Sequence, residues 1–177
     1  MLTLRAAQRG FSIVELMITI LVLGVIIGMA GPSFFEWLQN QQVRAAAEAL
    51  TNGLQVARGS AIQRNLAVQI SVGPGTGWTV SEALSGTVIQ TREHQEGTAN
   101  ATFVTTPGGS STVTFSPLGG MVANTDGTPS MTRVDVDNAL TAGASARALR
   151  VVITGGGSIR MCDPTPAIVA PDPRACP

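Results

Sequence analysis

The 177 residues are 44% hydrophobic and only 12% charged. The sequence contains no Lys, so all 11 basic residues are arginine, and it also contains no Tyr. The formal net charge is zero. This balance excludes general attraction to nucleic acid and leaves room only for a local basic patch. The length accommodates one membrane segment and one domain of ordinary size.

Residues 11–32 form a hydrophobic segment with the length of a membrane helix. Its only charged residue is Glu15. Folded as a helix, the segment is about 30 Å long, which matches the hydrocarbon thickness of a bilayer. Arg5 and Arg9 precede it, so the positive-inside rule places the N-terminus in the cytoplasm. We therefore expect a single membrane span with the rest of the chain on the other side.

Glu15 is costly within this segment. An acidic side chain at the centre of a bilayer costs about 2.5–3.5 kcal/mol, so we expect Glu15 near an edge or beside a cation. Cleavage between Gly10 and Phe11 would create a free α-ammonium group. Glu15 of one subunit would then pair with the N-terminus of a neighbour, which predicts an assembly contact between subunits.

The run Gly10-Phe11-Ser12-Ile13-Val14-Glu15-Leu16 resembles the class III signal of type IV pilins and type II secretion pseudopilins. The resemblance implies that residues 1–10 are a leader removed by a prepilin peptidase, and that the new Phe11 is N-methylated. It also implies residence in the bacterial inner membrane with a periplasmic head, which becomes extracellular in a pilus. Pro32 falls where the family has a proline.

An ordinary secretory signal peptide is the alternative for this N-terminus. Leu16–Ile27 would be its hydrophobic region, and Gly28-Met29-Ala30 its small-x-small cleavage site. An acidic residue has no purpose at the start of such a region. The two interpretations predict different mature N-termini, Phe11 and Gly31.

Residues 33–65 are expected to continue the helix as an amphipathic half, with a kink at Pro32 because proline removes one backbone donor. Apolar and small residues recur there at spacings of three and four, which defines one helical face. That face comprises Val43, Ala47, Leu50, Leu54, Ala57 and Ala61. The opposite face comprises Arg44, Glu48, Asn52, Gln55, Arg58 and Gln63. Asn65 is the predicted helix end.

Residues 66–177 read as a β-rich head with many short strands separated by Gly, Ser and Pro. The expected strands are 66–72, 78–80, 87–94, 101–105, 112–115, 121–123, 131–136, 147–153 and 158–162. No crossover helix separates them, so the sheets are expected to be antiparallel. The predicted fold class is α+β, with a long N-terminal helix packed on an antiparallel head as in type IV pilins.

Cys162 and Cys176 are the only cysteines, and a proline-rich segment separates them. An extracytoplasmic compartment is oxidising, so we expect a disulfide that closes a C-terminal loop. The alternatives are two unpaired thiols or a metal site. A metal site would need a nearby His or a third Cys, and the sequence has neither.

Later motifs, such as Leu54-Gln55-Val56-Ala57-Arg58 and Phe115-Ser116-Pro117-Leu118-Gly119, resemble the group of FimT-like and FimU-like minor pilins and the H pseudopilin of type II secretion. The resemblance implies a structural minor pilin whose partners are other pilin subunits. The alternatives are the secretion pseudopilin and a minor pilin that binds DNA during transformation.

DNA binding would depend on arginines near the C-terminus. FimT-like subunits carry Gly-Arg-x-Arg, and the matching residues here are Gly157-Ser158-Ile159-Arg160, so only the second arginine is present. If residues 155–157 form the loop of a hairpin, Arg150 and Arg160 share one face, and Arg174 completes a candidate patch. A two-residue loop would separate them. The alternative interpretation is a solvated strand face.

We expect no catalytic site, no cofactor and no metal. His94 is the only histidine and is expected to be exposed. The glycine clusters lead into strands, whereas dinucleotide cradles lead into a helix. Asp126, Asp135 and Asp137 lack the spacing of a calcium loop and fit turn and strand positions.

Overall fold

The computed structural model describes residues 11–94, 96, 98–138 and 147–177, so Gly10 and the predicted leader lie outside the described residues. It contains one long helix, α1 (Ile13–Arg64). The strands are β1 (Val68–Val72), β2 (Trp78–Glu82), β3 (Val88–Arg92), β4 (Ala101–Thr106), β5 (Thr112–Phe115), β6 (Met121–Val122), β7 (Arg133–Asn138), β8 (Leu149–Ile153) and β9 (Ile159–Cys162). The chain divides into two compact units, Met1–Trp37 and Leu38–Pro177, which are described separately.

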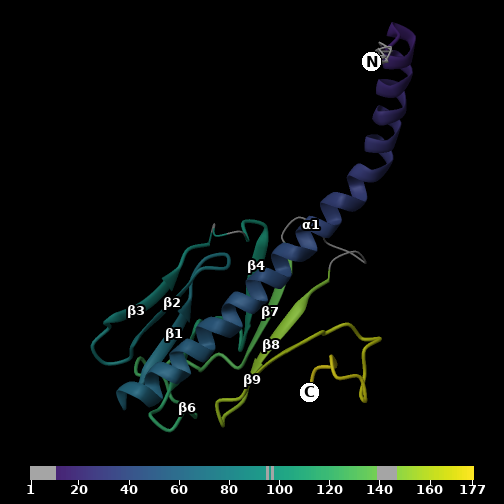
Figure 1. Cartoon of the computed structure of the whole chain (residues 1–177). Coiled ribbons are helices and arrows are strands. Elements are labelled where there is room, and N and C mark those ends of the chain that lie inside the picture. The colour runs from purple at the N-terminus through teal and green to yellow at the C-terminus, as the bar shows by residue number, and fades with distance from the viewer. Residues whose placement is uncertain (1–10, 95, 97, 139–146) are drawn as a thin grey trace, which may run out of the picture. The chain divides into compact units, whose positions relative to one another are not determined.

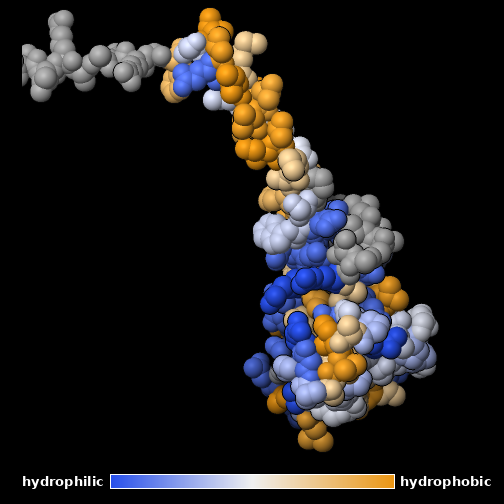
Figure 2. Space-filling model, turned by 90° about the vertical axis from the view of Figure 1, so that its right-hand side faces the viewer, coloured by the Kyte–Doolittle hydropathy of each residue, from blue (hydrophilic) through white to orange (hydrophobic). Residues whose placement is uncertain are grey.

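The described part of the first unit is almost entirely the apolar beginning of α1. This stretch of α1 is strongly apolar, and none of it is buried. Figure 2 shows hydrophobic side chains on the surface of this helix. By length and composition it is able to cross a membrane. The helix continues through Pro32, and the kink there stays a prediction.

The second unit holds the rest of α1 and two antiparallel sheets. Their strand orders are β3-β2-β1-β5-β6 and β4-β7-β8-β9. Figure 1 shows this part of α1 crossing in front of both sheets. The alternation of apolar residues in β1 and β7 puts Val68, Ile70, Val134 and Val136 in the core, each 0% exposed.

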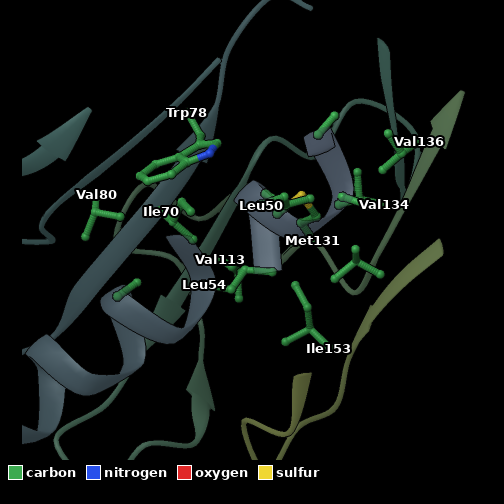
Figure 3. Close-up of a cluster of buried hydrophobic side chains, with 14 of the residues drawn as sticks. Leu50, Leu54, Ile70, Trp78, Val80, Val113, Met131, Val134, Val136 and Ile153 are labelled. Atoms are coloured by element: carbon green, nitrogen blue, oxygen red, sulfur yellow. The ribbon is translucent and has the colours of Figure 1, made fainter. Parts of the chain in front are cut away.

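The predicted apolar face of α1 is confirmed. All six of its residues are buried, and Ala46 joins them. Small residues let the helix approach the sheet closely, as Gly53 shows. A Cβ placed on Gly53 would lie 2.9 Å from Cε2 and Cζ2 of Trp78. Figure 3 shows Leu50 and Leu54 among side chains from both sheets, with Met131 and Val113 beside them.

The expectation that Arg58 belongs to the solvent face was incomplete. Arg58 is half-buried, and its Nε donates a hydrogen bond of 3.0 Å to the carbonyl of Gly119 in the loop between β5 and β6. Gly157, in the turn between β8 and β9, packs directly against Gly119, so an added Cβ would collide with that carbonyl. The φ of Gly157 is 77°, a conformation that favours glycine. Arg58 thus links the helix to loops from both sheets.

All nine predicted strands exist, with ends that differ by a few residues from those expected. Asn65 ends the helix as predicted, with a φ of 52° in the left-handed region. The antiparallel α+β fold class is confirmed.

Truncation of Leu54 tests the role of the helix–sheet core. Leu54 is 0% exposed, so we expect Leu54→Ala to lower the free energy of unfolding by about 2–5 kcal/mol. Leu84, which is 87% exposed, provides the matched control, and Leu84→Ala should change that value by about 0.5 kcal/mol or less. Denaturant unfolding of the full chain in detergent measures both. Equal effects would contradict the assigned core.

Candidate functional site

Glu15 lies in the first turn of α1. Ser12 caps this end, because the N–H of Val14 donates a 3.3 Å hydrogen bond to Ser12 Oγ. Glu15 therefore occupies the third helical position after Ser12, with the Ser-x-x-Glu spacing of a capping box, and the helix dipole also favours a carboxylate there. This local role was not among the predictions for Glu15, although the Ser-x-x-Glu spacing indicates it. Phe11 is 82% exposed and Glu15 is exposed as well, so both residues are accessible to another subunit.

The register of the β8–β9 hairpin places Arg150 and Arg160 on the same face. Arg150 is opposite Cys162 and Val152 is opposite Arg160. Thr154 N–H donates to the Ser158 carbonyl at 3.0 Å, which closes a three-residue loop. This is the first of the two registers considered from the sequence.

Arg150 is nevertheless paired with a carboxylate. Its Nε lies 2.6 Å from Oδ1 of Asp135, and the two side chains are 25% and 23% exposed. Arg133 Nε lies 3.3 Å from the other oxygen of Asp135. Arg133 was not predicted to belong to this face, although its spacing from Asp135 in a strand puts the two residues on the same side.

Arg174 is also paired. Its Nη2 lies 2.8 Å from Asp172 Oδ2, and its Nε donates to Asp172 Oδ1 at 3.2 Å. Hydrogen bonds from the side chain and backbone of Arg174 lower the pKa of Asp172 to about 2. The same pair raises the pKa of Arg174 above its ordinary value. Arg160 is exposed and donates to the carbonyl of Pro173 at 3.0 Å. The outer face of these strands thus carries Arg133, Arg150 and Arg160 together with Asp135 and Asp137, and the C-terminal loop beside β9 adds the pair of Arg174 and Asp172.

The disulfide between Cys162 and Cys176 is present, as predicted. Cys162 is 3% exposed at the end of β9. The loop that it closes returns along the strand, where Asp163 N–H donates to the Arg174 carbonyl at 2.8 Å. On the chain-entropy model, a loop of this size is stabilised by about 3 kcal/mol. The disulfide therefore holds Arg174 in the neighbourhood of β9.

His94 was expected to be exposed, but it is half-buried. Its Nδ1 accepts a 3.1 Å hydrogen bond from the backbone N–H of Thr76.

Asp126 accepts hydrogen bonds from the hydroxyl and from the backbone N–H of Thr128. These bonds lower the pKa of Asp126, and the bond from the hydroxyl has the larger effect. Within the described ranges, no three His, Cys, Asp or Glu side chains gather into a metal-binding group.

Comparisons of the sequence with known proteins identify a family and two relatives. Residues 46–157 match the family model of the type II transport protein GspH, and residues 5–31 match the prokaryotic N-terminal methylation motif. Two fimbrial proteins of Pseudomonas aeruginosa are 32% and 31% identical over 100 residues. Each match covers 52% of this chain and 64% of the relative, so the chain spans less than two thirds of their length.

The fold is also found in a solved structure. The type IV minor pilin FimU of Pseudomonas aeruginosa superposes with a TM-score of 0.53 at 20% sequence identity, over 71% of this chain and 91% of that one. An exposed apolar helix at the N-terminus, followed in the sequence by a disulfide-bonded antiparallel head, is a pilin-like arrangement. The chain belongs to the GspH family of minor pilins and pseudopilins.

The pairing of Arg150 and Arg174 leads to a prediction about DNA. Because carboxylates neutralise both guanidinium groups, we expect only weak binding of duplex DNA at low salt, carried by Arg160 and reduced as the salt concentration rises. A fluorescence anisotropy titration of the full chain measures it, with Arg160→Ala expected to weaken binding more than Arg174→Ala. Tight binding at physiological salt would contradict the solvated-face interpretation.

Proposed function

We propose that this chain is a structural minor pilin of a type IV pilus, incorporated into the filament or priming its assembly. The observation that carries the proposal is the exposed apolar start of α1, which lies within the match to the methylation motif at residues 5–31. A helix that leaves its hydrophobic side chains uncovered needs lipid or other helices around it. The fimbrial names of two relatives support the choice of a pilus.

In this proposal the chain begins as a single-pass protein of the bacterial inner membrane with a periplasmic head. A prepilin peptidase cleaves between Gly10 and Phe11, and Phe11 is N-methylated. The N-terminus keeps its positive charge after methylation and pairs with Glu15 of a neighbouring pilin subunit. Phe11–Pro32 then exchanges its lipid neighbours for the helices of other subunits, and the head becomes extracellular.

A pseudopilin of a type II secretion system is the second candidate, favoured by the GspH family model over residues 46–157. Deletion of the gene separates the two roles. A pilus subunit predicts loss or reduction of surface pili with normal protein secretion. Loss of secretion with normal pili would replace the first candidate by the second.

Replacement of Glu15 tests the assembly contact. Without the carboxylate, the α-ammonium of a neighbour has no partner inside an apolar bundle. We therefore expect Glu15→Ala to reduce incorporation into sheared filaments at least tenfold, measured by immunoblotting, while leader cleavage stays largely intact.

Glu15→Gln is the matched variant, because glutamine also fits the third position of the capping box but carries no charge. It should impair incorporation as much as Glu15→Ala does. Normal incorporation of Glu15→Gln would show that the capping role of Glu15, and not its charge, matters for assembly.

A further inference from the structure

Three aromatic rings cluster on the surface of α1 at the end of its apolar run. The ring centroid of Phe34 lies 6.4 Å from that of Phe35 and 5.9 Å from that of Trp37. Their residues are 59%, 63% and 55% exposed. Exposed aromatic clusters mark surfaces that become covered by a partner or by lipid.

The cluster is one-sided. At about 100° per residue, Phe34, Phe35 and Trp37 fall within an arc of about 160° on the helix. Glu36 lies on the opposite side of the same turn. The turn is therefore amphipathic, with an aromatic side and an acidic side. After Leu38 come four amides, Gln39-Asn40-Gln41-Gln42, which hydrocarbon does not accommodate.

The distance from this cluster to Glu15 matches a bilayer. Phe34 follows Glu15 by 19 residues, which corresponds to about 28 Å along a helix. The hydrocarbon core of a bilayer is about 30 Å thick. When the rings lie at one surface, Glu15 therefore lies at the other and avoids most of the cost of a carboxylate at the bilayer centre.

We propose that Phe34, Phe35 and Trp37 form an interfacial anchor that binds the periplasmic lipid surface of the membrane and holds Glu15 at the opposite surface. This rests on the proposed membrane stage of the subunit. Trp prefers the headgroup region because its ring system is apolar while its N–H finds a polar partner there, and Phe34 and Phe35 add apolar rings beside it. Two of the amides that follow bond to the head, because Gln42 Oε1 accepts from the Asn100 N–H at 3.3 Å and Asn40 Oδ1 accepts from the Arg147 N–H at 3.2 Å. The bilayer-length spacing between Glu15 and Phe34 therefore favours lipid as the partner of the rings.

The anchor fixes the depth of the subunit in the membrane before assembly. A helix held at both surfaces keeps the α-ammonium of Phe11 and the carboxylate of Glu15 in a polar layer until a filament takes up the subunit. Leaving the membrane then removes three rings from the headgroup region. Contacts in the filament have to compensate for that loss, which disfavours release of single subunits.

Trp37 provides the reporter that tests this proposal, because the chain has only two tryptophans and Trp78 is 3% exposed. The full chain is reconstituted in vesicles of phosphatidylethanolamine and phosphatidylglycerol that carry bromine either near the headgroups or near the ends of the acyl chains. We expect Trp37 fluorescence to be quenched at least twofold more strongly by the shallow bromines. Trp37→Phe should remove the quenched component, and Trp78→Phe should retain it.

Three results would overturn the proposal. Stronger quenching by the deep bromines would place the ring in the hydrocarbon core. A quenched component that survives in Trp37→Phe would belong to Trp78. If the brominated lipids do not quench Trp37 but aqueous acrylamide does, the ring lies in water. If neither quenches it, the ring lies against protein. Filament incorporation of the same chain is scored separately, so a correctly anchored chain that never enters filaments contradicts only the proposed function.

Discussion

The structure depends on one helix that must satisfy two environments. The beginning of α1 exposes its hydrophobic side chains, whereas the part after Leu38 buries a stripe of small and aliphatic residues against two sheets. A single stripe that contacts both sheets explains why Ala46, Ala47, Ala57 and Ala61 are fully buried. Larger residues there would push the sheets away from the helix and reduce the packing density of the core.

Polar side chains in the apolar half of α1 also have to suit an environment without water. Hydroxyl groups need partners when water is absent, and the backbone of the helix supplies them. Thr19 Oγ1 donates to the carbonyl of Leu16 at 2.8 Å, and Ser33 Oγ donates to that of Ala30 at 3.0 Å. Glu15 differs from both because a carboxylate only accepts hydrogen bonds. The helix dipole stabilises the carboxylate in the first helical turn, but the charge still needs a cation as its partner.

Periodicity made most of the fold predictable. The spacing of Val43 through Ala61 indicated the buried helical face, and alternation indicated the strands, because both patterns are set by local backbone geometry. The site was less predictable where it depends on contacts between distant residues. Arg58 reaches Gly119, and Asp135 pairs with Arg150. Neither pairing follows from a local pattern, so the basic face looked more strongly charged in the sequence than in the structure.

The central claim is that cleavage before Phe11 supplies the cation that makes Glu15 tolerable in an apolar helix. Mass spectrometry of the N-terminal peptide of the mature protein tests it most directly. The account predicts a peptide that begins with N-methylated Phe11. A mature chain that begins at Gly31, or one that retains residues 1–10, would contradict it.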